Sequence, residues 1–322
     1  MAQALRADKD VGHAYFDLNS GHKIPALGLG TWKTKPGVVR DAVFSALVEG
    51  GYLHIDCAFI YGNQEEVGTG FKAAWDAGIK REDVFITSKL WIKSNSPDKV
   101  KPALLQTLNE LGLDYLDLYL VHWPIYTTEN AGMPPKSKEE VLPYDIVGTW
   151  KAMESLVKGG LVKDIGVSNF SLPKLEILLK EATILPAVHQ VEMHPAWRND
   201  RILEHAKKNN IHVTAYSPLG SSQVDILDDA TTTEIAKKYG KSPAQVILRW
   251  CIQRGVSTIP KSSSERRIKE NEEVFGWSLS PEDFHKLNSV PYQKRTNPGA
   301  ELFVPEGMDQ AKLVSEFWDG DM

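Results

Sequence analysis

Short apolar runs alternate with longer amphipathic stretches along nearly the whole chain. Runs of this length suit buried strands, and the stretches between them have the three-to-four-residue spacing of apolar positions that is typical of helices. Strands that alternate with helices predict parallel strands joined by crossover helices. The predicted strands cover residues 26–29, 53–55, 84–87, 116–121, 161–167, 187–191, 212–215 and 256–259. Eight is the number in a (β/α)8 TIM barrel, so we predict an α/β fold of this kind.

The amphipathic stretches predict helices at residues 37–49, 65–77, 98–111, 145–157, 172–181, 200–209 and 265–274. An extra helix is predicted over 242–253, because Ser242 and Pro243 form a typical N-cap and first helical residue. Before the first strand, residues 14–24 predict an N-terminal β-hairpin at the bottom of the barrel. The segments 124–144 and 291–322 are long and irregular, and loops of this length are usually functional. The barrel therefore carries extra C-terminal helices and loops.

Length, charge and cysteine content exclude several classes of protein. A barrel of 322 residues forms one domain, so we expect a single domain over 1–322. A formal net charge of -5 without a long run of one sign provides no basic surface for nucleic acid. Cys57 and Cys251 lie far apart, which indicates neither a disulfide framework nor a metal cluster. No apolar run is long enough for a membrane span or, near the start, for a secretory signal, so we expect a cytoplasmic protein.

Polar residues recur where the predicted strands end. In a β/α barrel the catalytic groups lie at the carboxyl ends of the strands and in the loops that follow. A core packed only for stability would not repeat polar groups at these equivalent places, although each residue alone has an ordinary structural explanation. The residues at these positions are Asp56, Lys89, His122, Ser168, Asn169, Gln190, Tyr216 and Lys261.

Tyr61 follows Asp56 by five residues and can reach the same end of the barrel. A phenol beside Lys89 would have its ionised form favoured, so we expect the pKa of Tyr61 to be lowered towards neutral pH. Such a tyrosine can protonate a carbonyl oxygen while a hydride reaches the carbon. His122 would then be a neutral imidazole that orients the carbonyl. On spacing alone, either Tyr61 or His122 could be the acid, and Tyr61 alone could be an ordinary rim tyrosine.

A dinucleotide would need a site other than a Rossmann turn, because no Gly-x-Gly-x-x-Gly opens a helix after a strand. Barrels commonly bind phosphate in the loops after the seventh and eighth strands, here residues 217–222 and 261–264. The second loop is followed by Arg266 and Arg267 at the start of a helix. Hydroxyls, lysine and arginine at a helix N-terminus suit a phosphomonoester such as the 2′-phosphate of NADP. A solvated basic cap is the alternative explanation.

The motifs, taken together, resemble those of the aldo-keto reductase superfamily over essentially the whole chain. They are Gly-Leu-Gly-Thr-Trp at 28–32, His-Ile-Asp-Cys-Ala at 54–58 before Tyr61, Ser-Lys-Leu-Trp at 88–91, the segment 113–124 ending in Val-His-Trp-Pro, Gly-Val-Ser-Asn-Phe at 166–170, Tyr-Ser-Pro-Leu-Gly at 216–220 and Ile-Pro-Lys-Ser at 259–262. Residues 133–135 and 274–277 are similar to plant aldose or aldehyde reductases.

The resemblance implies an NADPH-dependent reductase of aldehydes or ketones, with a catalytic tetrad of Tyr61, Asp56, Lys89 and His122. It implies that Ser168, Asn169 and Gln190 hold the nicotinamide carboxamide and that Tyr216 stacks on the ring. By the same matching, the 2′-phosphate is held by Lys261, Ser262 and Arg267, and the adenine by Glu270 and Asn271. Further cofactor contacts are expected from Gly30, Thr31, Trp32, Asp56, Ser217, Leu219, Ser221 and Ser263.

The substrate end of the site is expected to be aromatic and apolar, which favours carbonyl compounds with a hydrophobic body. Its predicted walls are Trp32, Phe59, Ile60, Trp91, His122 and Trp123, together with the two irregular segments. Only about ten residues, 221–230, follow the seventh strand before the next helix. Many members of the family have a longer belt there, so we expect faster release of the cofactor. A monomer is expected from the resemblance alone.

Three other functions compete with a general carbonyl reductase. A specialised reductase of a sugar, sugar phosphate, steroid or polyketide intermediate would prefer one carbonyl by a wide margin. A non-catalytic NADPH-binding protein is possible because a fold does not imply a function. A metal-dependent hydrolase is disfavoured, because the histidines do not form a strand-end cluster with carboxylates at ligand spacing. These histidines are His54, His122, His189, His194 and His212.

Overall fold

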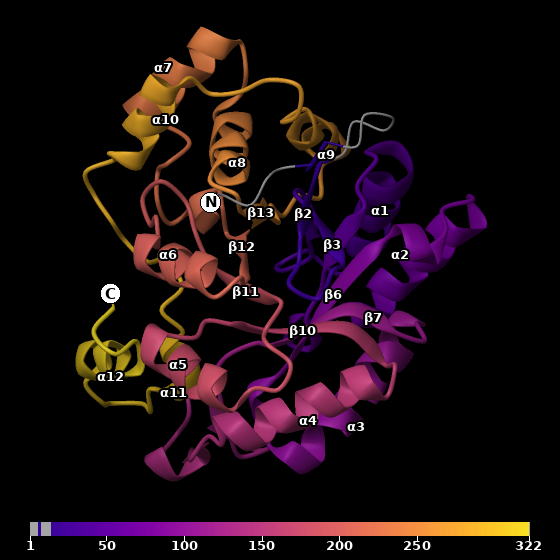
Figure 1. Cartoon of the computed structure of the whole chain (residues 1–322), viewed down its shortest axis with the longest axis vertical. Helices are drawn as coiled ribbons and strands as arrows, with labels where there is room; N and C mark the ends of the chain where they lie inside the picture. The colour runs from indigo at the N-terminus through magenta and orange to yellow at the C-terminus, as the bar shows by residue number, and fades with distance from the viewer. Residues whose placement is uncertain (1–5, 8–13, 322) are drawn as a thin grey trace.

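Eight parallel strands form the centre of the computed structural model, which describes residues 6–7 and 14–321 (Figure 1). Neighbouring strands follow one another in chain order. Gly28 N donates to Thr258 O at 2.9 Å, and Thr258 N donates to Ala26 O at 2.9 Å, which closes the barrel between its first and last strands. The predicted (β/α)8 barrel is confirmed. Its strands are β4 (Leu29–Gly30), β5 (His54–Asp56), β6 (Phe85–Leu90), β7 (Leu116–Val121), β10 (Val162–Ser168), β11 (Val188–Glu192), β12 (His212–Tyr216) and β13 (Ser257–Thr258).

Helices surround the barrel, and each predicted helix is present with its ends shifted by at most a few residues. The extra helix α8 (Pro243–Gln253) begins as predicted, because Ser242 Oγ accepts from Gln245 N and Gln245 Oε1 accepts from Ser242 N. The others are α1 (Val39–Phe44), which continues as a π-helical turn (Ser45–Glu49), α2 (Gln64–Asp76), α3 (Pro97–Leu111), α4 (Ile146–Lys158), α5 (Leu172–Glu181), α6 (Asp200–Lys208), α7 (Ala230–Tyr239) and α9 (Glu265–Glu272).

The N-terminal hairpin is also confirmed, with β2 (Ala14–Asp17) and β3 (Lys23–Pro25) paired antiparallel. A third short strand, β1 (Arg6–Ala7), pairs with β2 and was not predicted. The ring of Phe16 lies 4.9 Å from that of His212, at the start of β12. Asn19 Nδ2 donates to Pro186 O at 2.9 Å, just before β11 begins. The hairpin therefore covers the amino ends of the strands, opposite the expected site.

The prediction that 124–144 and 291–322 are irregular is wrong in part. The first segment contains the antiparallel pair β8 (Tyr126–Thr127) and β9 (Val141–Leu142), and the tail contains α11 (Ala300–Phe303) and α12 (Gln310–Phe317). A further helix, α10 (Pro281–Asn288), precedes the tail. These short elements are held by tertiary packing rather than by local pattern. The Trp318 ring, for example, lies 6.0 Å from that of Trp123.

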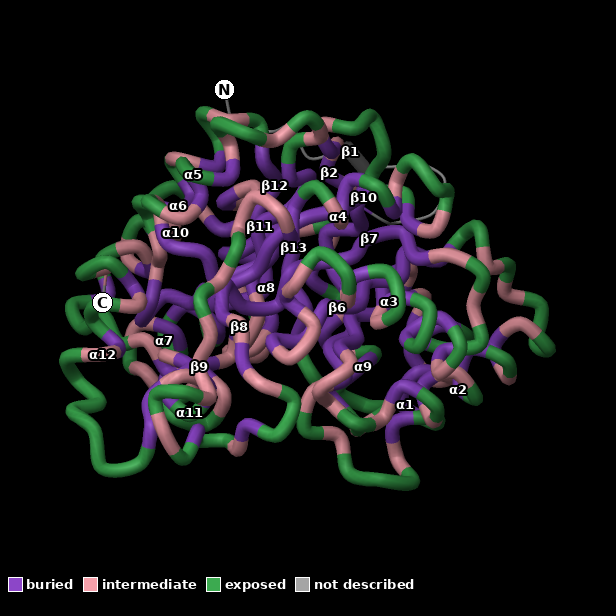
Figure 2. The backbone as a smooth tube through the Cα atoms, turned by 90° about the horizontal axis from the view of Figure 1, so that it is seen from below, coloured by how far each residue is buried: buried purple, intermediate pink, exposed green. Residues whose placement is uncertain are grey.

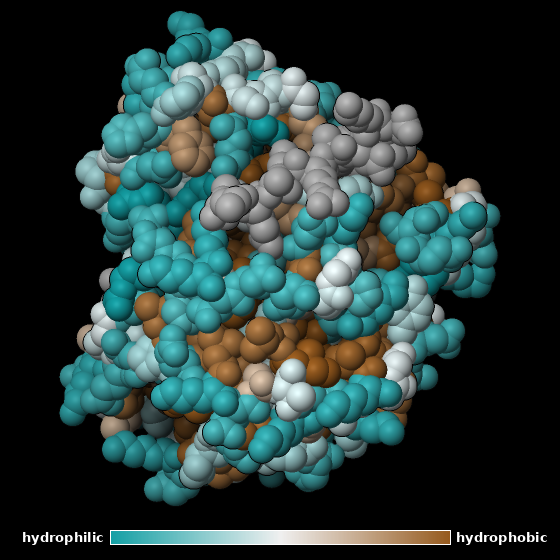
Figure 3. Space-filling model, in the orientation of Figure 1, coloured by the Kyte–Doolittle hydropathy of each residue, from teal (hydrophilic) through white to brown (hydrophobic). Residues whose placement is uncertain are grey.

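Burial follows the barrel. Buried residues gather along the strands at the centre and exposed residues occupy the outer turns (Figure 2). Hydrophilic residues predominate on the face seen in Figure 3, with apolar residues showing between them. Both cysteines are free and buried. In the part of the chain that the structure describes, no helix is long and apolar enough to cross a membrane.

The expectation about a leader segment concerns the first twenty residues, and most of these lie outside the described ones. Among residues 6–7 and 14–321, no group of three or more His, Cys, Asp or Glu side chains is placed to hold a metal ion.

Candidate active site

A buried ion pair forms the base of the site, at the carboxyl end of the barrel. Asp56 ends β5, and Lys89 lies in β6 beside it rather than after that strand as predicted. Lys89 Nζ donates to Asp56 Oδ1 at 2.5 Å and to Cys57 O at 2.8 Å. Gln190, within β11, donates from Nε2 to Asp56 Oδ2 at 2.8 Å. The carboxylate is therefore fixed by two side chains, and the ammonium is fixed by two oxygens.

Tyr61 closes a short 3₁₀ turn (Phe59–Tyr61) in the loop that follows β5. The turn brings its hydroxyl within 3.3 Å of Lys89 Nζ, which donates a hydrogen bond to it. The ring lies edge-on to that of His122, with centroids 6.0 Å apart. The sequence pattern thus placed Tyr61 correctly beside the ion pair.

The predicted lowering of the Tyr61 pKa is wrong. Burial of the hydroxyl raises the pKa well above its usual value, and the neighbouring Asp56 carboxylate raises it further. Lys89 does not reverse this effect, because its ammonium lies closer to Asp56, at 2.5 Å, than to Tyr61. The phenol is consequently protonated throughout the neutral pH range.

His122 directly follows β7 and is 8% exposed. Its ring lies edge-on to Trp91, with centroids 5.4 Å apart. Burial, and then the positive charge of Lys89, lower the pKa of His122 well below its usual value. Nδ1 has no hydrogen-bond partner among the described residues. The sequence predicted a neutral imidazole here, and the lowered pKa agrees with that prediction.

A cavity of about 710 Å³ opens above these residues. This volume falls within the range typical of small-molecule sites. Most of the predicted site residues line it: Gly30, Trp32, Asp56, Ile60, Tyr61, Trp91, His122, Trp123, Asn169, Gln190, Tyr216, Ser217, Leu219, Ser221, Lys261, Ser262, Ser263 and Arg267. Of the described residues that were predicted for the site, those that do not line the cavity are Thr31, Phe59, Lys89, Ser168, Glu270 and Asn271.

Two of these six residues support the lining from behind. Thr31 Oγ1 donates to the backbone oxygen of Asp56 at 3.0 Å, and Ser168 Oγ accepts from Asn169 Nδ2 at 3.1 Å. Asn169 also donates to His122 O at 3.0 Å and accepts from the Tyr216 hydroxyl at 2.8 Å. Three of the four side chains expected around a nicotinamide therefore form one hydrogen-bonded group that includes the backbone oxygen of His122. The fourth, Gln190, donates to Asp56 instead.

The other end of the cavity lies where β13 leads into α9 and carries the predicted cationic loop. Ser262 Oγ accepts from Ser264 N at 3.2 Å, which shapes the turn before the helix. Arg266 turns away and pairs with Glu270 at 3.1 Å, whereas Arg267 and Lys261 line the cavity. Neither of these two cations forms an ion pair with a residue in the described ranges. They are therefore available to an anionic ligand.

The segment after β12 is as short as predicted. A 3₁₀ turn (Gly220–Ser222) leads to Asp229, whose carboxylate accepts from Thr231 N and Thr232 N to cap α7. Ile226 is completely buried, and Leu227 lines the cavity. Because Ile226 is buried in the middle of this segment, few of its residues are left to cover a ligand.

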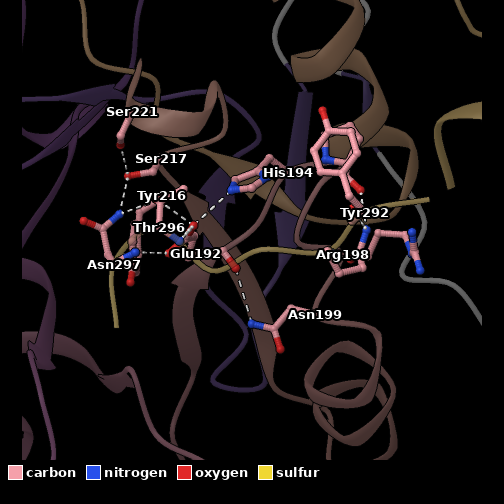
Figure 4. A network of polar contacts seen from close by, with 12 residues as sticks. Glu192, His194, Arg198, Asn199, Tyr216, Ser217, Ser221, Tyr292, Thr296 and Asn297 are labelled. Atoms are coloured by element: carbon pink, nitrogen blue, oxygen red, sulfur yellow. Dashed lines mark hydrogen bonds and ion pairs between the residues drawn. The ribbon is translucent and has the colours of Figure 1, made fainter. Parts of the chain in front are cut away.

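A buried network beside the cavity was not predicted (Figure 4). Glu192 ends β11, and its Oε1 accepts from Thr296 N and Thr296 Oγ1, both at 2.7 Å, and from His194 Nε2 at 3.0 Å. Its Oε2 accepts from Asn297 N at 2.8 Å. Asn297 also reaches Ser217 Oγ at 3.5 Å. Glu192 therefore ties the C-terminal tail to the rim of the barrel, and no local pattern around it indicated this contact.

Known proteins are similar to this chain in both sequence and fold. A model of the Aldo/keto reductase family matches residues 26–291. The Arabidopsis thaliana protein named Aldo-keto reductase family 4 member C11 is 48% identical over 314 residues, which cover 96% of this chain and 98% of that protein.

Two solved structures extend the comparison to three dimensions. The aldose reductase of Schistosoma japonicum superimposes with a TM-score of 0.85 at 40% identity, covering 91% of this chain and 98% of the other. A Bombyx mori aldo-keto reductase, solved in complex with NADP, gives a TM-score of 0.79 at 37% identity, covering 85% and 91%. The family model, the relative and the two structures agree with one another, and this chain belongs to the Aldo/keto reductase family.

Proposed function

We propose that this protein reduces aldehydes and ketones, including aldoses, to alcohols, with Tyr61 as the general acid. The observation that supports this role most directly is the Asp56–Lys89–Tyr61 series of contacts at 2.5 and 3.3 Å, on the wall of a cavity that His122 also lines. Burial keeps the phenol protonated at neutral pH, as a proton donor requires. Neutral His122 can hydrogen-bond the carbonyl oxygen, and Asp56 holds Lys89 against the phenol.

The enzyme is an NADP-dependent oxidoreductase, and the cavity fits that cofactor. When bound, NADPH supplies a hydride to the carbonyl carbon. Lys261, Ser262 and Arg267 would hold the 2′-phosphate, because two unpaired cations stand beside hydroxyls there. Ser168, Asn169 and Gln190 would hold the carboxamide beside Tyr216. Glu270 and Asn271 would contact the adenine, with Glu270 also paired with Arg266.

We further propose that residues 1–322 form one domain and that the protein is a cytoplasmic monomer, similar to plant aldose and aldehyde reductases. The physiological substrate is a separate question. The aromatic walls, with Trp32, Trp91 and Trp123, favour a carbonyl compound with a hydrophobic body. A specialised reductase, and an NADPH-binding protein without catalysis, are the competing proposals.

Oxidation of NADPH and NADH with a panel of aldehydes, ketones and sugars tests the reaction. We expect turnover to be much faster with NADPH, and the ranking of carbonyls to separate a general reductase from a specialised one. Tight NADPH binding without turnover of any carbonyl would favour the non-catalytic alternative.

The Lys261→Gln/Arg267→Gln double variant tests the phosphate site. We expect its KM for NADPH to rise about tenfold or more, with little change for NADH, because each charge-assisted hydrogen bond contributes about 1.5–3 kcal/mol. Arg266→Gln is the matched control. It removes a positive charge from the same helix turn, but Arg266 is paired with Glu270 and should not contact the cofactor. Equal losses with both cofactors would contradict the assignment.

The short belt predicts rapid release of the cofactor. Because only residues 217–229 separate β12 from α7, and Ile226 is buried, little chain has to open before dissociation. Stopped-flow measurement of NADP(H) release should give a faster rate than in relatives with a long belt. A rate no faster than theirs would show that the belt does not control release.

A further inference from the structure

One carboxylate in the cavity wall has no partner in the part of the chain that the structure describes. Of the described residues that line the cavity, Asp56 and Glu301 carry carboxylates. Asp56 is bound by Lys89 and Gln190, whereas the side chain of Glu301 forms no hydrogen bond or ion pair with any residue in the described ranges. Glu301 lies in α11, in the C-terminal tail. Glu301 is therefore a charge on the cavity wall that is free to pair with a charged group of a ligand.

The tail is fixed firmly enough to make Glu301 a constant part of the pocket. Glu192 accepts from the backbone of Thr296 at 2.7 Å and of Asn297 at 2.8 Å, just before α11 begins (Figure 4). Trp318 Nε1 donates to Pro298 O at 3.0 Å. At Gly299 the backbone rests on Trp123, where an added Cβ would lie 2.5 Å from the indole. The carboxylate is therefore carried on a segment that contacts the aromatic wall directly.

The charge of Glu301 reaches the site only weakly. Burial and the charge of Glu192 raise the pKa of Tyr216 most, Arg295 lowers it, and Tyr61 and then Glu301 raise it by smaller amounts. Among the described residues, Lys33, Lys261 and Arg267 are the cations that line the cavity, and none of them forms an ion pair with Glu301. Lys33 Nζ lies 4.2 Å from the centroid of the Trp32 ring, and Lys261 and Arg267 stand in the loop and helix after β13. Ala300 and Leu302, the chain neighbours of Glu301, pack in the same hydrophobic cluster as Trp91 and Trp123, so α11 lies at the aromatic, substrate end of the cavity.

We infer that the pocket prefers carbonyl compounds that carry a positively charged amine on an apolar or aromatic body. The inference rests on the proposed reductase function and names its substrate class. Glu301 supplies the opposite charge, and the aromatic wall with Trp91 and Trp123 supplies an apolar surface for the body of the substrate. Glu301 is exposed, so water screens the attraction and the preference is moderate rather than absolute.

Two aldehydes of the same shape test the preference. 4-(Dimethylaminomethyl)benzaldehyde is cationic at neutral pH, and 4-isobutylbenzaldehyde is its neutral counterpart. We expect kcat/KM to favour the cation about three- to tenfold in the wild type. In Glu301→Gln the ratio should fall to about one, with turnover of the neutral aldehyde retained. Glu306→Gln is the matched control, because it removes the same charge from an exposed position of the same tail outside the cavity lining.

A ratio unchanged in Glu301→Gln, or a wild type that prefers the neutral aldehyde, would overturn the inference. The inference would also be overturned if kcat/KM for 4-(2-hydroxypropyl)benzaldehyde, which carries a hydroxyl but no charge, exceeded that of the isobutyl aldehyde as much as kcat/KM of the cation does. Binding of the corresponding amino and isobutyl alcohols to the NADP⁺ complex, followed by tryptophan fluorescence, needs no turnover. If no aldehyde is reduced, the proposed function fails. The ratio of the two alcohols' Kd values, compared between the wild type and Glu301→Gln, then still decides whether Glu301 selects a cation.

Discussion

Replacement of Tyr61 by Phe is expected to lower kcat for carbonyl reduction by about 10²–10⁴-fold, the range typical of a lost general acid. The fold should survive, because Lys89 keeps its bonds to Asp56 and to Cys57 O when the phenol oxygen is removed. The cavity also keeps its aromatic wall. Binding of NADPH, measured by protein fluorescence, should therefore stay near the wild-type value while oxidation of NADPH almost stops.

Tyr292→Phe provides the matched control for this experiment. Tyr292 is 39% exposed and lies outside the cavity lining, so its hydroxyl should be dispensable. Near-normal turnover by Tyr61→Phe would contradict Tyr61 as the acid and would move the role to His122, the alternative that the sequence alone left open. Loss of NADPH binding together with turnover would instead indicate a structural role for Tyr61.

Acidification is expected to destabilise the protein steeply below about pH 6.5, because buried histidines resist protonation. Burial lowers the pKa of His54, His189 and His212 to about 3 in each case. In the unfolded chain these residues bind protons from about pH 6.5 downwards, while the folded protein does not. Each then costs about 1.4 kcal/mol of folding free energy per pH unit, or about 4 kcal/mol for the three together.

The urea midpoint of unfolding, measured between about pH 7 and pH 5, should therefore fall as the pH falls. His54→Asn should reduce the slope by about one quarter, because His122 is a fourth buried histidine with a lowered pKa and one of the four groups is removed. Since this variant could fold poorly, ¹⁵N-histidine spectra of the wild type give a second measurement. Ring signals of His54, His189 and His212 that titrate with a pKa near about 6.5 in the folded state would refute the explanation.

The sequence predicted the positions of the proposed catalytic groups well because their spacing follows the strands. Asp56 ends β5 and His122 directly follows β7, as the apolar runs indicated. Lys89 and Gln190 also reach the site, although both lie inside strands rather than after them. The error has no consequence for placement, since the last residues of each strand already stand at the mouth of the barrel.

The electrostatic state of Tyr61 could not be predicted in the same way. Counting Lys89 as a neighbour indicated a lowered pKa, but the result depends on the degree of burial and on which partner the ammonium contacts first. Lys89 Nζ is 2.5 Å from Asp56 and 3.3 Å from Tyr61. Differences of less than 1 Å between side chains from separate strands are not encoded in any local pattern.

The sequence by itself determined the number and order of the strands and the polar residues at their ends, because strand and helix periodicity are local properties of the chain. Only the tertiary structure decided how the tail meets the site. Glu192 bonds Thr296 across 104 positions of the chain, and this contact brings Glu301 to the pocket. Such contacts depend on how separate segments pack, so they arise only after the barrel has brought those segments together.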